Sequence, residues 1–412
     1  ILLKKAYFCD LSISNQMKLS KIPLLGRIIL AIILGVLLGQ FVPPWFARIF
    51  VTFNDLFGNF LSFLIPLIIV GLVTPAIGEL GKGAGRLLLI TTLIAYTSTL
   101  FSGFFTYFSC QLSFPTLLEG VSFPTTGTDS SNNVLKTYFS INMPPLLDVM
   151  SALIFSFCVG IGISIIKGQT LQKAFVDFRD IITRIIASVI IPLLPIYIFG
   201  MFMSMTVSGQ VYSVIMLFLK VIVAVFIIQI LVLLILFSIA GIMSGRNPLK
   251  LLKTMLPAYA TALGTSSSAA TIPVTLDCTL KNKVTEPIAS FTIPLCATIH
   301  LPGSTLKIVA FSVAFMYFSG MPVELGTFTE FIFLIGIAMI AAPGVPGGAI
   351  MAAVGIIQSV LGFNEELIAM MITAYLAIDS FGTACNVTGD GAIAIIIDKI
   401  ADKEAQTNNI FL

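Results

Sequence analysis

Long apolar runs separated by short polar segments dominate the first 245 residues. Each run carries few or no charged residues and approaches or exceeds the about 20 residues with which a helix crosses a bilayer. The runs lie at residues 22–42, 60–77, 87–108, 149–166, 181–205 and 211–243. The short alternating segments of membrane β-strands are not found. The pattern therefore predicts an all-α polytopic membrane protein with six N-terminal spans.

The apolar pattern after residue 245 is interrupted four times by Gly, Pro, Ser, Thr or acidic residues. The interruptions lie at 264–268, 300–304, 342–348 and 379–390. Non-helical backbone at membrane depth is tolerated only where it is buried in protein or lines a wet cavity. A hairpin with a polar turn followed by a broken span, repeated once, predicts an inverted repeat with a binding site at its interface. Ordinary spans with kinks are the alternative.

Composition and charge agree with a membrane protein. The 412 residues are 57% hydrophobic and 10% charged, against about 25% charged in soluble domains. The net charge of +3 gives no indication of nucleic-acid binding, and the six scattered cysteines, without metal-ligand spacing, favour small core residues. Basic residues precede the first run and follow the second, fourth and sixth, which predicts that these segments are cytoplasmic.

Two carboxylates lie within the last apolar stretch. Asp379 and Asp390 are 11 residues apart, close to three turns of a continuous helix, so both can face one cavity. Ionisable groups inside a membrane are costly, and we interpret both as functional. The alternative for Asp390 is a solvated charge near the cytoplasmic end.

The motifs at these interruptions resemble those of the dicarboxylate/amino acid:cation symporter family, which has the glutamate-transporter fold. The resemblance covers roughly residues 20–400. It rests on the serine-rich segment 266–275, on Gly344-Val345-Pro346-Gly347-Gly348, and on Asp379, Thr383 and Asn386-Val387-Thr388-Gly389-Asp390. It implies eight transmembrane helices, two re-entrant hairpins, an elevator-type transport domain, a homotrimer, and cytoplasmic termini in a plasma (inner) membrane.

The same resemblance implies a division of the chain. A cytoplasmic segment, 1–20, precedes six helices at 21–245 that form the scaffold and part of the transport domain. The transport core follows at 246–400, with hairpin one, broken helix seven, hairpin two and helix eight, and a cytoplasmic tail covers 401–412.

The resemblance also implies site residues. Asp379 would take the ammonium of the substrate, and sodium, the coupling ion, would be held at Asp390 and Asn386, since hard cations prefer oxygen ligands; no organic cofactor is expected. The substrate residues would be Ser267, Ser268, Ser304, Val345, Gly347, Asp379, Gly382, Thr383 and Asn386, and the cation residues His300, Asn386, Asp390, Tyr96 and Thr99. Helix–helix hydrogen bonds are the alternative for Thr383 and Asn386, and core packing for Tyr96 and Thr99.

The first departure from the family pattern concerns the substrate. Acidic-substrate members have an Arg directly before the Thr of the last helix, and here that position is Gly382. A buried side-chain carboxylate would lack its bidentate partner. We therefore predict a small neutral amino acid rather than an acidic one, with a dicarboxylate held by Lys307 as the alternative.

The second departure lies in helix seven, where the family's Asn-Met-Asp-Gly-Thr reads His300-Leu301-Pro302-Gly303-Ser304. An acid is lost at Pro302, and Lys307 adds a base nearby. We predict that Lys307 is a tethered cation paired with Asp390, so that fewer sodium ions move per substrate, and that His300 makes coupling sensitive to pH. Snorkelling of Lys307 to an interface is the alternative.

The sequence thus predicts a secondary symporter and not an enzyme. A channel-like or solute-sensing derivative is an alternative that the altered helix seven leaves open. An intramembrane hydrolase using Ser267, His300 and an Asp is a further alternative, although no Gly-x-Ser-x-Gly elbow precedes a helix.

Overall fold

A computed structural model describes residues 24–80, 86–119, 135–166, 169–343 and 346–409, and these residues form helices joined by turns and loops, without strands. The first helices are α2 (Leu24–Gly39), α3 (Pro44–Leu80), α4 (Arg86–Leu117), α5 (Val149–Ile165), α6 (Thr170–Ile185), α7 (Ile191–Val207) and α8 (Val211–Ser244). The later helices are α9 (Pro248–Thr254), α10 (Leu256–Thr265), α11 (Ser268–Lys281), α12 (Glu286–Ile299), α13 (Pro302–Phe318), α14 (Leu325–Ala341), α15 (Gly348–Leu361), α16 (Glu365–Ala377) and α17 (Asp379–Asn409).

Six helical stretches in the described part of the chain are long and apolar enough to cross a membrane. They are Pro44–Gly78, Leu87–Leu117, Thr170–Val207, Val211–Ser244, Glu286–Phe318 and Asp379–Ala401. The third combines α6 and α7 through a π-helical turn, and shorter apolar helices, α2, α5, α14 and α15, lie beside these stretches. These lengths agree with the prediction of a polytopic α-helical membrane protein.

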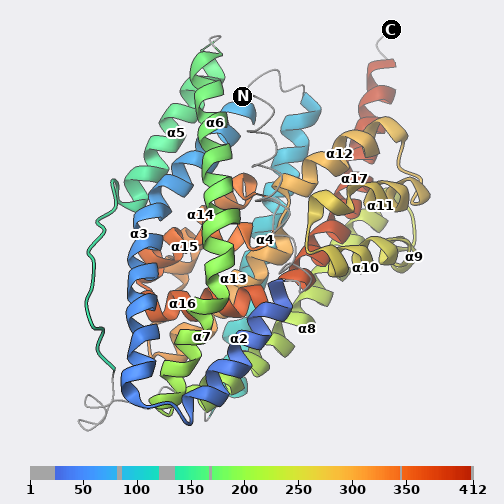
Figure 1. Cartoon of the computed structure of the whole chain (residues 1–412). Coiled ribbons are helices and arrows are strands. Elements are labelled where there is room, and N and C mark those ends of the chain that lie inside the picture. The colour runs from blue at the N-terminus through green and yellow to red at the C-terminus, as the bar shows by residue number, and fades with distance from the viewer. Residues whose placement is uncertain (1–23, 81–85, 120–134, 167–168, 344–345, 410–412) are drawn as a thin grey trace, which may run out of the picture.

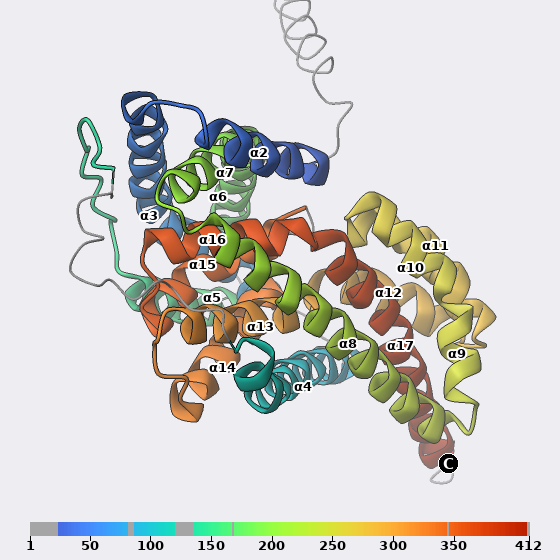
Figure 2. The same cartoon turned by 90° about the horizontal axis from the view of Figure 1, so that it is seen from below.

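The helices divide into an outer group and an inner group. α3 packs against α5, α6 and α7, and α2 packs against α7, as the blue and green ribbons in Figure 1 show. α17 packs against α8, α10, α12 and α13 (Figure 2). In the most apolar 18-residue segment of Asp379–Ala401, 94% is buried, whereas in the corresponding segment of Val211–Ser244 only 39% is buried. α17 is therefore a central helix, whereas α8 leaves an apolar face free for lipid.

The two predicted polar turns join pairs of packed helices. α10 and α11 are in contact and are joined at Ser266 and Ser267, and α14 and α15 are in contact and are joined by residues 342–347. Ser266 adopts a left-handed conformation with φ 50°, and the Ser267 hydroxyl caps α11 by accepting from Ala270 N–H at 3.3 Å. Gly347 has φ 74°, a conformation that favours glycine. Each predicted turn therefore joins a pair of packed helices, and the re-entrant character of these pairs stays a prediction.

The two broken spans behave differently. α12 ends before His300 and α13 begins at Pro302, which confirms the predicted break. The predicted interruption over 379–390 is wrong, because α17 is helical from Asp379 onwards and the break lies one residue earlier, at Ile378. Polar side chains here do not break the helix: the Thr383 hydroxyl, for instance, donates back to the Asp379 carbonyl at 3.1 Å, a contact that helices tolerate.

Candidate functional site

The hairpin tips and the helix breaks meet around a small, partly open cavity. Its volume is about 30 Å³, which has room for one or two water molecules. The lining comes from the first tip, the second tip, the break before α13 and the first turns of α17. It includes Ser266, Ser268, Ser304, Gly347, Tyr375, Asp379, Thr383 and Asn386. The fold thus brings most of the predicted substrate residues together.

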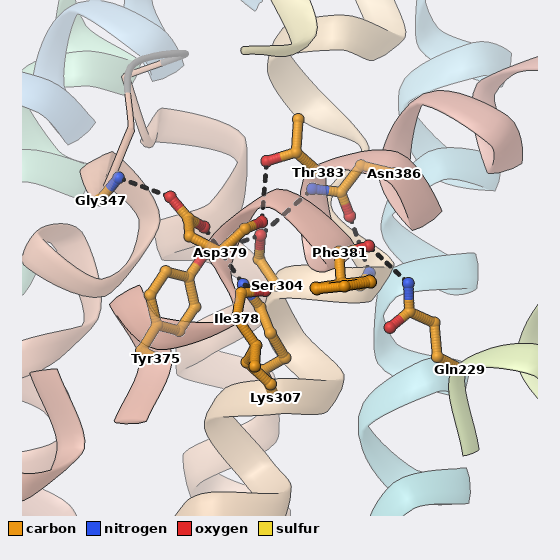
Figure 3. A network of polar contacts seen from close by, with 11 residues as sticks. Gln229, Ser304, Lys307, Gly347, Tyr375, Ile378, Asp379, Phe381, Thr383 and Asn386 are labelled. Carbon is orange, nitrogen blue, oxygen red and sulfur yellow. Dashed lines mark hydrogen bonds and ion pairs between the residues drawn. The ribbon is translucent and has the colours of Figure 1, made fainter. Parts of the chain in front are cut away.

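Asp379 connects the second hairpin tip to the interior. It is the first residue of α17, where the helix dipole favours a negative charge. Its Oδ2 accepts a hydrogen bond from Gly347 N–H at 2.8 Å, and its Oδ1 lies 3.1 Å from Nζ of Lys307 (Figure 3). Both carboxylate oxygens are therefore engaged by the protein itself.

Lys307 is fully buried on α13 and is held from three directions. Besides Asp379, its Nζ lies 3.5 Å from the Ile378 carbonyl oxygen and 3.7 Å from the centre of the Tyr375 ring. The ring contact is a cation–π interaction. The predicted pairing with Asp390 is therefore wrong, and so is the alternative that Lys307 snorkels to an interface.

Gly382 explains why Lys307 reaches Asp379. A Cβ atom placed on Gly382 would collide with Cε and Nζ of Lys307. The missing side chain on α17 thus leaves the space that the lysine of α13 fills. A positive charge remains in this part of the site, but it comes from a different helix than the family pattern provides.

A second set of hydrogen bonds joins α13 to α17. The Ser304 hydroxyl oxygen accepts from the Tyr375 hydroxyl at 3.0 Å and from Asn386 Nδ2 at 3.1 Å. The Asn386 Oδ1 accepts from Gly303 N–H at 2.7 Å. Both polar atoms of Asn386 have protein partners, so the same side chain that lines the cavity also fixes the start of α13.

The other predicted acid, Asp390, is paired with the histidine of the chain. His300 Nδ1 lies 2.8 Å from Asp390 Oδ1, and His300 Nε2 lies 2.9 Å from the Ser98 hydroxyl oxygen. His300 is 0% and Asp390 1% exposed. The two side chains are therefore in contact, and neither lines the cavity at the hairpin tips. A cation role for them stays a prediction.

Comparison with known proteins identifies the family. Residues 24–400 match the sodium:dicarboxylate symporter family. The chain belongs to this family. It is 26% identical over 398 residues to the serine/threonine transporter SstT of Acinetobacter baumannii (strain AYE), covering 92% of this chain and 97% of the relative.

Two animal members of the symporter family are similar over a shorter part. Excitatory amino acid transporter 3 of Mus musculus is 28% identical over 297 residues, which is 70% of this chain and 56% of the relative. Excitatory amino acid transporter 1 of Homo sapiens is 28% identical over 272 residues, which is 64% of this chain and 49% of the relative. The family is one of membrane symporters and includes amino-acid transporters, so the chain is a transporter and not an enzyme.

Ser98, His300 and Asp390 are hydrogen-bonded in series, as the serine, histidine and acid of a hydrolase triad are. Membership in the symporter family decides how this contact is interpreted. The predicted hydrolase alternative used Ser267, but that hydroxyl caps α11 and the histidine faces Ser98 instead. Ser98 and His300 are both buried, and neither lines the cavity at the hairpin tips. We interpret the contact as part of a transporter core.

Some predicted site residues lie elsewhere in the symporter. The Tyr96 hydroxyl donates to the Phe333 carbonyl at 3.3 Å, and the Thr99 hydroxyl donates to the Ala95 carbonyl of its own helix at 3.0 Å. These contacts agree with the packing alternative, and a cation role for both stays a prediction. Val345 lies outside the described residues.

Three residues that contact the predicted site residues or the helix that carries them were missed from the sequence. Tyr375 faces Lys307, Ser98 faces His300, and Gln229 Nε2 donates to the Phe381 carbonyl at 2.5 Å. Tyr375 lies four residues before Asp379, and Ser98 lies between two residues that the resemblance named. Spacing could have indicated those two, whereas Gln229 comes from a separate helix and gave no such signal.

Proposed function

We propose that this chain is a secondary active symporter that couples the inward movement of sodium to the uptake of a small carboxylate-bearing solute. The observation that carries the proposal is the convergence of both hairpin tips on Asp379, Thr383 and Asn386 around one cavity. Non-helical backbone at the centre of a membrane protein is expected where solute and ions bind. Family membership supports symport.

The solute would enter and leave by movement of the second hairpin tip. This is supported by the hydrogen bond from Gly347 N–H to Asp379, which ties that tip to α17. Opening the tip would break this bond and expose Asp379. We propose that the chain has eight transmembrane helices and that its two hairpins are re-entrant. We propose further that the core 246–400 moves as an elevator against a scaffold formed by the N-terminal helices, and that three chains assemble with their termini in the cytoplasm.

The proposed sodium site uses Asp390 and Asn386. A buried carboxylate with an amide oxygen one turn away fits a hard cation. His300 is a neighbour of this site through its 2.8 Å contact with Asp390. Because Pro302 replaces an acid of the family pattern, we propose that fewer sodium ions are bound than in relatives that keep it.

The names of the relatives limit the class of solute without identifying one compound. Serine and threonine are the solutes in the name of one relative, and amino acids in the names of two others. Gly382, in place of Arg, favours a neutral amino acid over an acidic one, and Lys307 keeps organic acids as the alternative. Both classes share a carboxylate, which the first hairpin tip would hold at the start of α11.

The test is uptake into proteoliposomes that contain the purified chain. We expect L-serine, L-alanine, L-lactate or L-malate to accumulate when sodium is high outside, and accumulation to stop when the gradient is abolished. Vesicles without protein are the control. Ion current without dependence on solute would instead favour a channel, and uptake unchanged by collapse of every ion gradient would contradict symport.

A further inference from the structure

We infer that the ammonium of Lys307 occupies the place at Asp379 that an amino-acid ammonium would need, so that the solute is a small carboxylic acid without an α-ammonium, such as a 2-hydroxy acid. The inference rests on the proposed function and names the solute class for the same site. Among the described residues that line the cavity, Asp379 is the only acidic one. An incoming ammonium would therefore have to share it with Lys307.

The first step is that Lys307 cannot easily leave Asp379. Its side chain is 0% exposed, and its Nζ is enclosed by the carboxylate, the Ile378 carbonyl and the face of the Tyr375 ring. A buried ammonium that loses its carboxylate is strongly unfavourable. The pair is thus a fixed part of the site.

The second step concerns what remains of Asp379 for a solute. Oδ1 is taken by Lys307, and only Oδ2 becomes free when Gly347 N–H moves away. An α-ammonium at Oδ2 would be a second cation on one carboxylate, and like charges repel strongly where water is excluded. An α-hydroxyl can donate to Oδ2 without adding charge.

The third step concerns the solute carboxylate. With Asp379 neutralised by Lys307, the cavity no longer presents an uncompensated negative charge to an anion. Ser268 begins α11, a helix of 14 residues, and lines the cavity, so the positive end of this helix is near. The Ser304 hydroxyl accepts two hydrogen bonds and keeps its own hydrogen to donate, and Asn386 Nδ2 has a second hydrogen, so both can donate to a carboxylate. The site therefore suits an anion with a neutral α-substituent better than a zwitterion.

The test compares pairs of acids that differ only in the α-substituent. Binding to the purified full-length protein, with sodium present, is measured calorimetrically for L-lactate against L-alanine and for L-malate against L-aspartate. We expect the hydroxy acid of at least one pair to bind, with a Kd about 10-fold or more below that of its amino partner, because like charges would face each other in the amino complex. This comparison needs no variant.

Variants assign the selectivity to the lysine. Lys307→Met should reverse the ratio of the two Kd values, because Asp379 is then free for an ammonium, and Lys307→Arg should keep the wild-type order. The ratio within one variant does not depend on the fraction of folded protein. Lys220→Met on α8, where the lysine Nζ lies 3.5 Å from the Glu119 carbonyl oxygen, is the control and should leave the ratio unchanged.

Two results would overturn the inference alone. One is tighter binding of L-alanine or L-aspartate than of the hydroxy partner by the wild-type protein, together with sodium-driven uptake. The other is a Kd ratio in Lys307→Met equal to that of the wild type. If none of the four acids bound and none was taken up with a sodium gradient, the proposed function would be wrong and the inference with it.

Discussion

Two acid–base pairs lie along α17, and they differ in what surrounds them. Asp379 pairs with Lys307 beside the cavity, touches the second hairpin tip, and keeps 11% of its side chain exposed. Asp390 pairs with His300 away from the cavity and is 1% exposed. The first pair is within reach of an entering solute once the tip moves. The second is buried among helices and does not line this cavity.

The two pairs are also linked. Asn386 lies between them on α17 and holds Gly303 and Ser304 at the start of α13, the helix that carries Lys307. His300 lies two residues before this helix. A change at either acid can therefore shift the start of α13 and reach the other. We call Asp379–Lys307 the outer pair and Asp390–His300 the inner pair. We propose that the outer pair selects the solute, that the inner pair responds to the cation, and that α13 and α17 couple the two pairs.

The largest expected effect comes from separating the outer pair. Asp379→Asn leaves the buried ammonium of Lys307 without a counter-charge, which should lower the free energy of unfolding by about 3–5 kcal/mol and abolish solute binding. The measurement is denaturant unfolding of the protein in detergent. Adding Lys307→Met should restore most of the stability but not the binding. Equal stability of the single and double variants would show that the pair is not coupled.

The next largest effect is expected on the sodium dependence of uptake, when the inner pair is changed and the outer pair is left intact. Asp390→Asn keeps an acceptor for His300 but removes the charge proposed to bind sodium. We expect the sodium concentration for half-maximal uptake to rise about 5–150-fold, the usual range of coupling between two sites, while the maximal rate at saturating sodium changes less. An unchanged sodium dependence would remove Asp390 from the cation site.

Alanine substitutions at two glycines of α17 compare the packing around the two pairs, and each should destabilise the protein less than the loss of a charge. Gly382→Ala would collide with Lys307, whereas an alanine at Gly389 would have His300 Cε1 as its nearest neighbour at 3.1 Å. Both substitutions gain helix propensity equally. Gly382→Ala should therefore reduce stability by about 1–3 kcal/mol and Gly389→Ala by less, as measured by unfolding. The reverse order would argue against a tightly packed outer pair.

The smallest effect is expected at Tyr375. Tyr375→Phe removes the hydrogen bond to Ser304 but keeps the ring over Lys307, and should lower the free energy of unfolding by about 1 kcal/mol. Tyr375→Leu also removes the ring face and should cost more. Thermal unfolding of the two variants side by side tests this, and equal losses would mean that the cation–π contact contributes nothing.

Sequence patterns predicted the parts of this site that local chemistry decides. The serine-rich turn, the Gly-rich turn and the His300 break follow from residues that end helices, and each lies where the pattern placed it. The polar stretch from Asp379 misled, because tertiary packing overrides the weak helix propensity of Ser, Thr, Asn and Gly. Here neighbouring helices enclose them.

The pairing of the charges could not be predicted in the same way. Which acid Lys307 contacts depends on the rotation of α13 against α17, and no spacing within one helix fixes that rotation. One signal was present: a positive charge is missing at Gly382 and another appears at Lys307. Because the collision between a Gly382 side chain and Lys307 is a contact between distant segments, only the fold makes the compensation visible.

The proposed division between the two pairs is tested most directly by sodium binding in the absence of solute. Calorimetric titration of sodium into the wild-type protein, Asp379→Asn and Asp390→Asn reports each acid separately. Asp379→Asn should bind sodium within a few-fold of wild type, and Asp390→Asn should bind it about 10-fold or more weakly, the effect of losing about 1.4 kcal/mol. Loss of sodium binding in Asp379→Asn with wild-type affinity in Asp390→Asn would contradict the division.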